Sequence, residues 1–291
     1  MKKVVDLDGR QAVLCRPEPW PRRQLSALVA GGERDVDLAR ASLLVACEEY
    51  PGLDVGAYLD RIDAMAEALR GRLESSAGGT VRALNRVLFE EEGFHGNVRE
   101  YYDPRNSFLN DVLDRRMGIP ITLSTVYIAV GRRAGVKVEG VGLPGHFRVR
   151  VAAAAGEALV DPFHLGVVMT EKDCQDRLDR IYAGRVRLDR EMLAPCPPWA
   201  MLSRMVRNLK AIHVKEGDAV RALRAADLLV LLNPGAPEEV RDRGLLLAAL
   251  ECYALAARDL EAYVAAAPHA PGTEQMRARA ADLRLKASRL N

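Results

Sequence analysis

The chain has 291 residues, 49% of them hydrophobic and 28% charged, so it is long enough for one large or two modest globular domains and is not composed like a disordered protein. Its 42 basic and 40 acidic side chains leave a formal net charge of +2. This balance gives no electrostatic reason to expect nucleic acid or an anionic membrane as a partner.

Cysteine usage and the apolar runs both favour a cytoplasmic protein. The five cysteines, at positions 15, 47, 174, 196 and 252, are scattered and form neither a C-x-x-C pair nor a disulfide framework. The apolar runs are far too short to cross a bilayer. The start, MKKVVDLDGR, turns acidic before any apolar core develops, unlike a secretory signal. We therefore expect a reducing compartment and no membrane partner.

The first third of the chain reads as a helical lead-in. Prolines 17, 19 and 21 predict irregular structure over residues 1–30. Apolar residues then recur with the helical period, and serine and glycine at 75–79 indicate a loop. Thr80 is the expected N-cap of the helix that follows this loop. Helices are expected at 35–50, 54–73 and 80–94.

The middle of the chain changes from helical to strand periodicity. A short helix running through Leu113 is followed by a helix over 120–134, with Pro120 in its first turn and Gly135 after its end. Beyond it apolar residues alternate with polar ones, which is the period of a half-buried strand. We expect strands at about 136–142, 146–152, 157–162 and 166–169, then a return to helix.

The last third is all helical and contains a repeat. The proline-rich stretch APCPPW, residues 194–199, is the expected boundary between a domain at 1–195 and a second at 196–291. Aligning GDAVRALRAADLLVLLNP with ECYALAARDLEAYVAAAP places Pro234 over Pro268, 34 residues apart. A 34-residue helix-turn-helix period ending in proline is typical of tetratricopeptide repeats. Two unrelated antiparallel helix pairs are the alternative.

A candidate site combines the start of the 120–134 helix with two neighbouring strands. His146 begins the second strand and Asp161 ends the third. A nucleophile at a helix N-terminus gains from the positive end of the helix dipole, while a histidine takes its proton and a carboxylate orients the imidazole. The structural alternative is a core histidine bonded to a turn carbonyl, with Asp161-Pro162 as an ordinary strand-ending turn.

Several long motifs resemble the bacterial Sir-B family, the invasion-regulator type with a transglutaminase-like N-terminal domain. The segments are YYDPRNSFLNDVLDRRMGIPITLS, GVGLPGHFRVRV and LVDPFHLG, with NLKAI and RDRGLLL in the tail, and the resemblance covers roughly residues 35–285. It implies a papain-like fold with a Cys-His-Asp triad followed by a tetratricopeptide tail. By motif, His146 and Asp161 match the second and third triad members.

The first triad member is missing. No cysteine lies between residues 48 and 173, and the hydroxyls nearest the expected place are Thr122 and Ser124. Two positions along a helix turn it by about 200°, so at most one of them points at His146. Thr122, in the first turn, is the better match. A hydroxyl ionises far less readily than a thiol, which weakens the catalytic reading.

The polar loop before this helix could line a cleft. Arg105 would bind a carboxylate, Asn106 or Asn110 would donate to an oxyanion, and Tyr102 would complete the wall. The structural alternative makes Asn106 or Ser107 a helix cap and lets Asn110 satisfy loop backbone.

Metal and phosphate chemistry are not expected. His146, Asp161, His164 and His95 could supply ligands if the fold gathered them, but no paired spacing supports this. The stretch SAGGTV lacks the lysine and the preceding strand of a phosphate-binding loop. We expect neither a metal nor a cofactor.

Taken together, the sequence predicts an α+β protein: a transglutaminase-like helix on an antiparallel sheet, with a helical lead-in and an all-α tetratricopeptide-like region. A fold alone does not confer function. We expect a regulatory module that binds a protein or peptide in the cleft where the resembled family has its catalytic triad. We expect neither nucleic acid nor a membrane as a partner. The alternative is an amide hydrolase or acyltransferase that uses Thr122 or Ser124 with His146 and Asp161.

Overall fold

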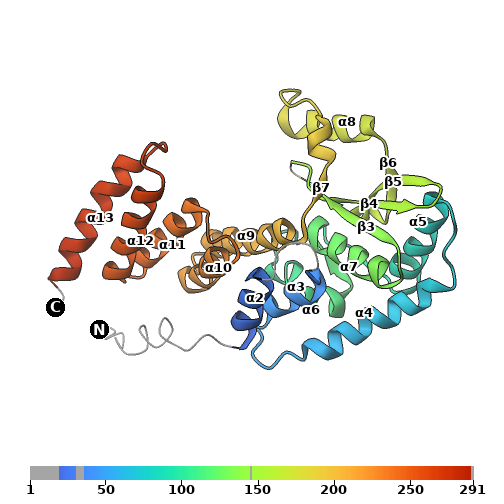
Figure 1. The fold of residues 1–291 in the computed structure, drawn as a ribbon, viewed down its shortest axis with the longest axis horizontal. Coiled ribbons are helices and arrows are strands. Elements are labelled where there is room, and N and C mark those ends of the chain that lie inside the picture. The colour runs from blue at the N-terminus through green and yellow to red at the C-terminus, as the bar shows by residue number, and fades with distance from the viewer. Residues whose placement is uncertain (1–19, 31–35, 145, 290–291) are drawn as a thin grey trace.

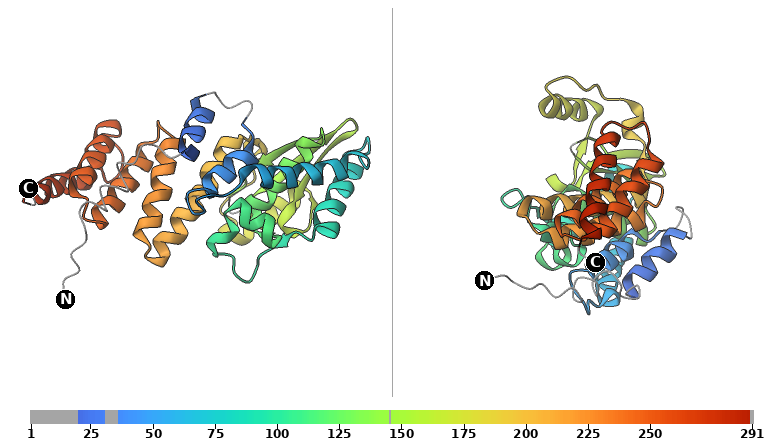
Figure 2. Two further views of the ribbon diagram at one scale, coloured as in Figure 1. Left: turned by 90° about the horizontal axis from the view of Figure 1, so that it is seen from below. Right: turned by 90° about the vertical axis from the view of Figure 1, so that its left-hand side faces the viewer.

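The computed structural model describes residues 20–30, 36–144 and 146–289. Figure 1 shows an elongated molecule, with the sheet and its covering helices at one end and the C-terminal helix α13 (Thr273–Ser288) at the other. The view from below in Figure 2 shows the same order along the long axis. No helix in the described ranges is both long and apolar enough to span a membrane.

An antiparallel sheet forms the centre of the first part of the chain. Within the described residues its five strands lie in the order β6-β5-β4-β3-β7. The four strands expected from the sequence are confirmed to within two residues at each end; the two-residue β7 was not expected. Their bounds are β3 (Lys137–Val141), β4 (Arg148–Ala153), β5 (Gly156–Asp161), β6 (Val167–Met169) and β7 (Pro195–Cys196).

Helix α7 (Pro120–Arg133) packs against one face of this sheet, and its residues from Pro120 to Gly131 are all buried. A Cβ on Gly131 would lie 2.5 Å from Cγ2 of Val138, so glycine permits the close approach of helix and strand. The helix stops where the sequence indicates, with Ala134 as C-cap and Gly135 at a φ of +88°. This packing fixes the start of α7 relative to the strands.

Helices of the lead-in complete this layer. They are α2 (Trp20–Ala30), α3 (Leu38–Ala46), α4 (Val55–Arg70), α5 (Ala77–Asn85) and α6 (Leu109–Arg115). Helix α5 continues as the π-helical turn η2 (Arg86–Glu91). Their apolar faces join α7 and the sheet in one hydrophobic cluster.

Two expectations for the lead-in are wrong. Trp20–Ala30 is helical, because Pro21 lies in the first turn, where a missing backbone N–H costs little; residues 1–19 lie outside the described ranges. Helix α5 begins before Thr80, because Ser76 is its N-cap and accepts the Gly79 N–H at 3.0 Å. Thr80 instead donates its hydroxyl to the carbonyl of Glu74.

The other face of the sheet carries a smaller apolar layer. Helix α8 (Glu171–Tyr182) lies over it, on the side away from α7 (Figure 1). Its buried Cys174 packs with Val141 and Leu143. The 3-10 turn η5 (Arg190–Leu193) closes the layer before β7. This second layer therefore covers the face of the sheet opposite to α7.

The C-terminal helices pack as successive antiparallel pairs. They are α9 (Pro198–Glu216), α10 (Ala219–Leu232), α11 (Pro237–Ala249), α12 (Tyr253–Ala266) and α13. Helices α10 and α12 begin 34 residues apart, as the aligned repeat predicts. Most buried apolar residues of α9 and α10 belong to the same cluster as α3 and α7, whereas α11–α13 form a separate one that includes Leu223 of α10. The domain boundary at 195/196 stays a prediction.

Candidate functional site

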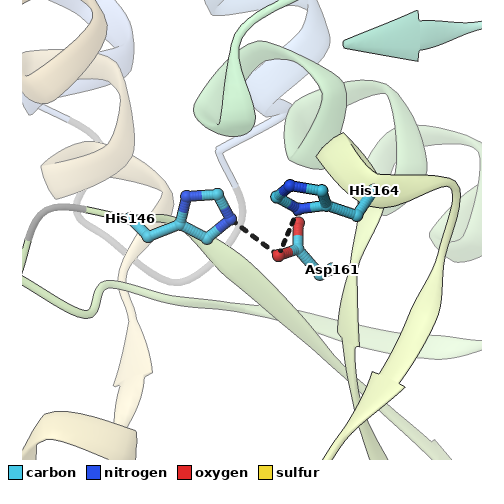
Figure 3. Close-up of side chains that lie close together, drawn as sticks. All are labelled: His146, Asp161 and His164. Atoms are coloured by element: carbon cyan, nitrogen blue, oxygen red, sulfur yellow. Dashed lines mark hydrogen bonds and ion pairs between the residues drawn. The ribbon is translucent and has the colours of Figure 1, made fainter. Parts of the chain in front are cut away.

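Two histidines meet one buried aspartate at the end of the sheet (Figure 3). Nε2 of His146 lies 2.8 Å from Oδ2 of Asp161, and Nδ1 of His164 lies 2.9 Å from the same oxygen. The other carboxylate oxygen accepts the backbone N–H of Phe163 at 3.1 Å. His146 and Asp161 are 3% and 1% exposed, whereas the side chain of His164 is about half exposed. The spatial pairing expected of residues 146 and 161 is present.

Strand register explains why these residues meet. Val149 of β4 pairs with Val160 of β5, so the last residue of β5, Asp161, lies at the end of the sheet where β4 begins. His146 precedes the first residue of β4 by two positions and therefore lies at the same end of the sheet. Asp161 is also the N-cap of the 3-10 turn η4 (Pro162–His164). This turn brings His164 back over the carboxylate, a partner that the sequence analysis considered only as a metal ligand.

The electrostatics favour a neutral imidazole beside an ionised carboxylate. Burial would raise the pKa of Asp161, but the hydrogen bonds and charges of His146 and His164 outweigh it and lower this pKa to about 2. Burial lowers the pKa of His146 and outweighs the opposing effect of Asp161; the guanidinium groups of Arg177 and Arg148 lower it further. Around neutral pH His146 is therefore a hydrogen-bonded neutral ring.

The hydrogen bond to Asp161 also fixes the tautomer of His146. An ionised carboxylate only accepts, so Nε2 must carry the proton and Nδ1 is left as an acceptor. Within the described residues Nδ1 has no hydrogen-bond partner. A free Nδ1 on a rigid ring can accept a hydrogen bond or take a proton from a group placed next to it.

A small pocket of about 50 Å³ opens beside His146. One wall is the start of α7, with Ile119, Pro120 and Ile121. The remaining lining comes from the polar loop, the turn before β4 and helix α9, namely Tyr101, Phe147, Arg204 and Asn208. The helix start therefore contributes Ile119, Pro120 and Ile121 to the lining, and none of these residues has a nucleophilic side chain.

Neither hydroxyl considered as a nucleophile lines this pocket. Thr122 is completely buried, donates its hydroxyl to the carbonyl of Asn106 at 2.8 Å and accepts the backbone N–H of Ile119 at 3.1 Å. It thus caps α7 and ties the helix to the polar loop. Ser124 is also completely buried and its hydroxyl has no partner. No hydrogen bond joins either hydroxyl to His146 in the described chain.

The four polar-loop residues separate into different places. Asn106 is fully buried and donates to the carbonyls of Glu100 and Tyr101 at 2.7 and 3.2 Å, which holds the loop together. Arg105 is exposed and pairs with Asp103 at 2.7 Å. Arg105 is not among the residues that line the pocket, and its expected carboxylate-binding role stays a prediction.

The other two loop residues also lie outside the pocket lining. Tyr102 is 64% exposed, with Nζ of Lys215 4.5 Å from its ring centre. Asn110 is buried in α6, and its Oδ1 has no partner. Ser107 does not cap α6, as one reading expected, because the N-cap position is Phe108 and the Ser107 hydroxyl has no partner.

Sequence reasoning missed several lining residues. It named Tyr102 where the adjacent Tyr101 faces the pocket, and no local pattern distinguishes the two. It also missed Arg204 and Asn208, because both come from α9, beyond the expected domain boundary. Their four-residue spacing on one helix face was the available signal.

The same three side chains are also the group in the described chain that could hold a metal ion. One ligand atom from each of His146, Asp161 and His164 lies within 4.8 Å of the others. Both imidazoles, however, direct a nitrogen at the carboxylate at hydrogen-bond distance, and a nitrogen that donates a proton cannot ligate. His95, the fourth candidate ligand, is not in this group.

Family models of known proteins match both parts of this chain. Residues 56–207 match the family model of the transglutaminase-like superfamily, and residues 209–281 match a tetratricopeptide repeat model. The fold class expected from the sequence and the tetratricopeptide reading of its repeat are thus confirmed. No solved structure matches.

Several curated proteins are similar over much of their length. A UPF0162 protein of Xylella fastidiosa is 36% identical over 263 residues, covering 89% of this chain and 94% of its own. A UPF0162 protein of Pseudomonas aeruginosa is 30% identical over 77% of this chain and 82% of its own. F-box only protein 21 of Mus musculus is 34% identical over 52% of this chain but only 25% of its own length. This chain belongs to the transglutaminase-like superfamily and to its UPF0162 proteins.

Proposed function

We propose that this protein is a regulatory binding module that holds a peptide segment of a protein partner beside His146 without forming a covalent intermediate. The observation that carries the proposal is the wall of the pocket at the start of α7, where the lining residues are Ile119, Pro120 and Ile121. Covalent catalysis needs a nucleophile within hydrogen-bond reach of its base. This wall offers none.

The groups that remain suit recognition of a peptide backbone. Nδ1 of His146 accepts a hydrogen bond, whereas Arg204 and Asn208 can donate to carbonyl oxygens. Tyr101 adds an aromatic edge and packs edge-on against Phe163, with ring centres 6.1 Å apart. A peptide amide offers both a donor and an acceptor to such a lining.

The helical tail supplies a second binding surface in this proposal. Helices α11–α13 form their own apolar cluster beyond the sheet, and tetratricopeptide stacks present extended surfaces to partner segments. A partner held by the tail would deliver a local segment to the pocket at a raised effective concentration. The motif resemblance to the Sir-B family and a cytoplasmic location both fit this regulatory role.

Photo-crosslinking in cells tests the proposal. A photoreactive residue at Asn208 in the pocket and another at Leu285, which is 52% exposed on α13, should capture the same polypeptide. Val214, which is 55% exposed on α9, is the control position. Truncation after Asn233 removes α11–α13 and keeps the helices that share the first core, so it should abolish the crosslink at Asn208 while leaving the site folded.

Labelling with a serine-directed fluorophosphonate separates this proposal from the hydrolase alternative. The expected intact mass is that of the unmodified chain, because the Thr122 hydroxyl is engaged by Asn106 and Ile119. An adduct on Thr122 or Ser124 that disappears in His146→Ala would contradict the proposal and establish the hydrolase.

A further inference from the structure

A second buried charge, the guanidinium of Arg148, lies beside the His146 site. Arg148 is 1% exposed, and its Nε and Nη2 atoms have no hydrogen-bond partner among the described residues. It is the first residue of β4 and pairs with Val141, whose side chain packs with Leu143 and Cys174 under α8. A full positive charge is thus enclosed in an apolar layer, which costs free energy unless a partner meets it.

A second guanidinium approaches the same place from α8. Nε of the half-buried Arg177 is also buried without a partner. Arg177 follows Cys174 by three residues on α8, and Cys174 packs with Val141, the strand partner of Arg148. In keeping with this position, the charge of Arg177 disfavours the protonated forms of His146 and Arg148. Neither arginine forms an ion pair in the described part of the chain.

The charges of Asp161 and Asp173 both act on Arg148, but neither carboxylate forms a hydrogen bond with it. The Asp173 carboxylate accepts the backbone N–H and the hydroxyl of Thr170. Asp161 is one position beyond the β4–β5 pair Val149–Val160, close to Arg148, yet both of its oxygens are taken by His146, His164 and the backbone of Phe163. The buried carboxylate of Asp161 therefore has its hydrogen-bond partners within the protein, whereas the buried guanidinium of Arg148 has unpaired N–H groups in the described chain. Arginine is the residue that binds carboxylates through a planar fork of donors.

We propose that Arg148 and Arg177 form an anion-binding site between β4 and α8 that takes the carboxylate of a peptide ligand. The choice of a peptide carboxylate rests on the proposed function, because the peptide held by His146 lies next to this site. The site itself rests on the two unpartnered guanidinium groups. The ligand class is then an acidic side chain or a chain terminus located next to the amide that contacts His146.

Nuclear magnetic resonance of the arginine Nε–H groups in the full-length protein tests this directly. The probes are N-acetyl-trialanine with a free carboxylate, its C-terminal amide, and inorganic phosphate, all at constant ionic strength. The peptide acid should shift the Arg148 and Arg177 signals saturably, and the amide should bind at least about tenfold more weakly, as expected for loss of a charged hydrogen bond.

Variants provide the controls. Arg177→Gln, on the half-buried residue, should weaken peptide-acid binding by at least about tenfold. Arg180→Gln on the same helix should leave it unchanged, because Arg180 is exposed and bonds only the carbonyl of Asp176. Arg148→Met assigns the Arg148 signal and should abolish binding if its amide spectrum shows an intact fold.

Each contrary result has a distinct meaning. If acid and amide shift His146 equally without moving the arginine signals, the anion site is wrong and the proposed function stands. If phosphate shifts both arginines and the peptide acid does not, the site is real but the carboxylate assignment is wrong. If no probe moves His146 or either arginine, both proposals fail.

Discussion

Asp161 and Arg148 are both almost completely buried, on neighbouring strands, yet the fold treats their charges in opposite ways. The Asp161 carboxylate receives three hydrogen bonds from His146, His164 and the backbone of Phe163. Two nitrogens of the Arg148 guanidinium, by contrast, donate no hydrogen bond to any described residue. One buried charge thus has its partners within the fold, whereas the other, in our proposal, pairs with the carboxylate of a ligand. Removing each charge should distinguish the two cases.

The largest effect is expected from Asp161→Ala. This change leaves the buried N–H of the His146 imidazole and the Phe163 N–H without an acceptor, and each buried donor left unsatisfied costs about 1–3 kcal/mol. Urea unfolding measures the loss. Glu157→Gln on the same strand is the control, because Glu157 is exposed and its loss should change stability by less than about 0.5 kcal/mol. If Asp161→Ala lowers the free energy of unfolding no more than the control does, the Asp161 carboxylate does not stabilise the fold.

Arg148→Met should act in the opposite direction. In buffer without a binding anion, replacing an unpaired buried charge by an apolar side chain of similar length should leave the free energy of unfolding unchanged or raise it by up to about 4 kcal/mol. The same urea experiment compares it with Asp161→Ala. A clear loss of stability would mean that Arg148 already has partners within the fold. That result would contradict the contrast between an unpaired Arg148 and a paired Asp161.

Thr122 tests whether the hydroxyl at the helix start is structural. Thr122→Val keeps the shape but leaves the Ile119 N–H and the Asn106 carbonyl unpaired, at a cost of about 1–3 kcal/mol. Thr122→Ser retains both hydrogen bonds and should cost less than the valine. If valine is harmless, the hydroxyl is not a structural group and the catalytic alternative regains its candidate.

The pH dependence of stability tests the state of His146. Because its folded pKa lies below the ordinary value of about 6.5, the unfolded chain binds more protons in the window below that pH. The free energy of unfolding should therefore fall as the pH drops below about 6.5. The groups around His146 are Asp161, His164, Arg148 and Arg177.

His146→Gln isolates this contribution, because the amide can still donate to Asp161 but does not titrate. Denaturation curves between pH 5 and 7 should be flatter for the variant than for the parent chain. A variant that keeps the full pH dependence would assign it to other groups.

The smallest effect is expected from Arg105→Gln. Arg105 is exposed and pairs with Asp103 outside the pocket lining, and exposed ion pairs add little to stability because solvent screens them. Stability and peptide binding should both stay close to those of the parent chain. A large loss of binding would restore the cleft role that the sequence suggested for this residue.

Periodicity and motif made much of the fold predictable. The strands, the helix after Pro120 and the 34-residue repeat depend on patterns within single segments, which a sequence displays directly. The pairing of His146 with Asp161 depended only on the register of one short hairpin and a family motif. These features need no knowledge of distant contacts.

The orientation of polar side chains was not predictable in the same way. From the sequence alone, Thr122 fits the role of a nucleophile as well as that of a helix cap. Its role is decided by its hydrogen bond to the carbonyl of Asn106, 16 residues earlier in the chain. Arg148 reads as the polar face of an alternating strand, and only the packing of α8 buries it. Arg204 and Asn208 enter the pocket because α9 folds back onto the first core.

A single titration tests the central claim that the pocket binds a peptide without cutting it. The imidazole nitrogen signals of His146 in the full-length protein are followed as N-acetyl-trialanine is added, and the peptide is then analysed by mass spectrometry. The account predicts a saturable shift of the Nδ1 signal and an unchanged peptide after a day of incubation. The absence of any shift, or the release of shorter peptides by the parent chain but not by His146→Gln, would contradict it.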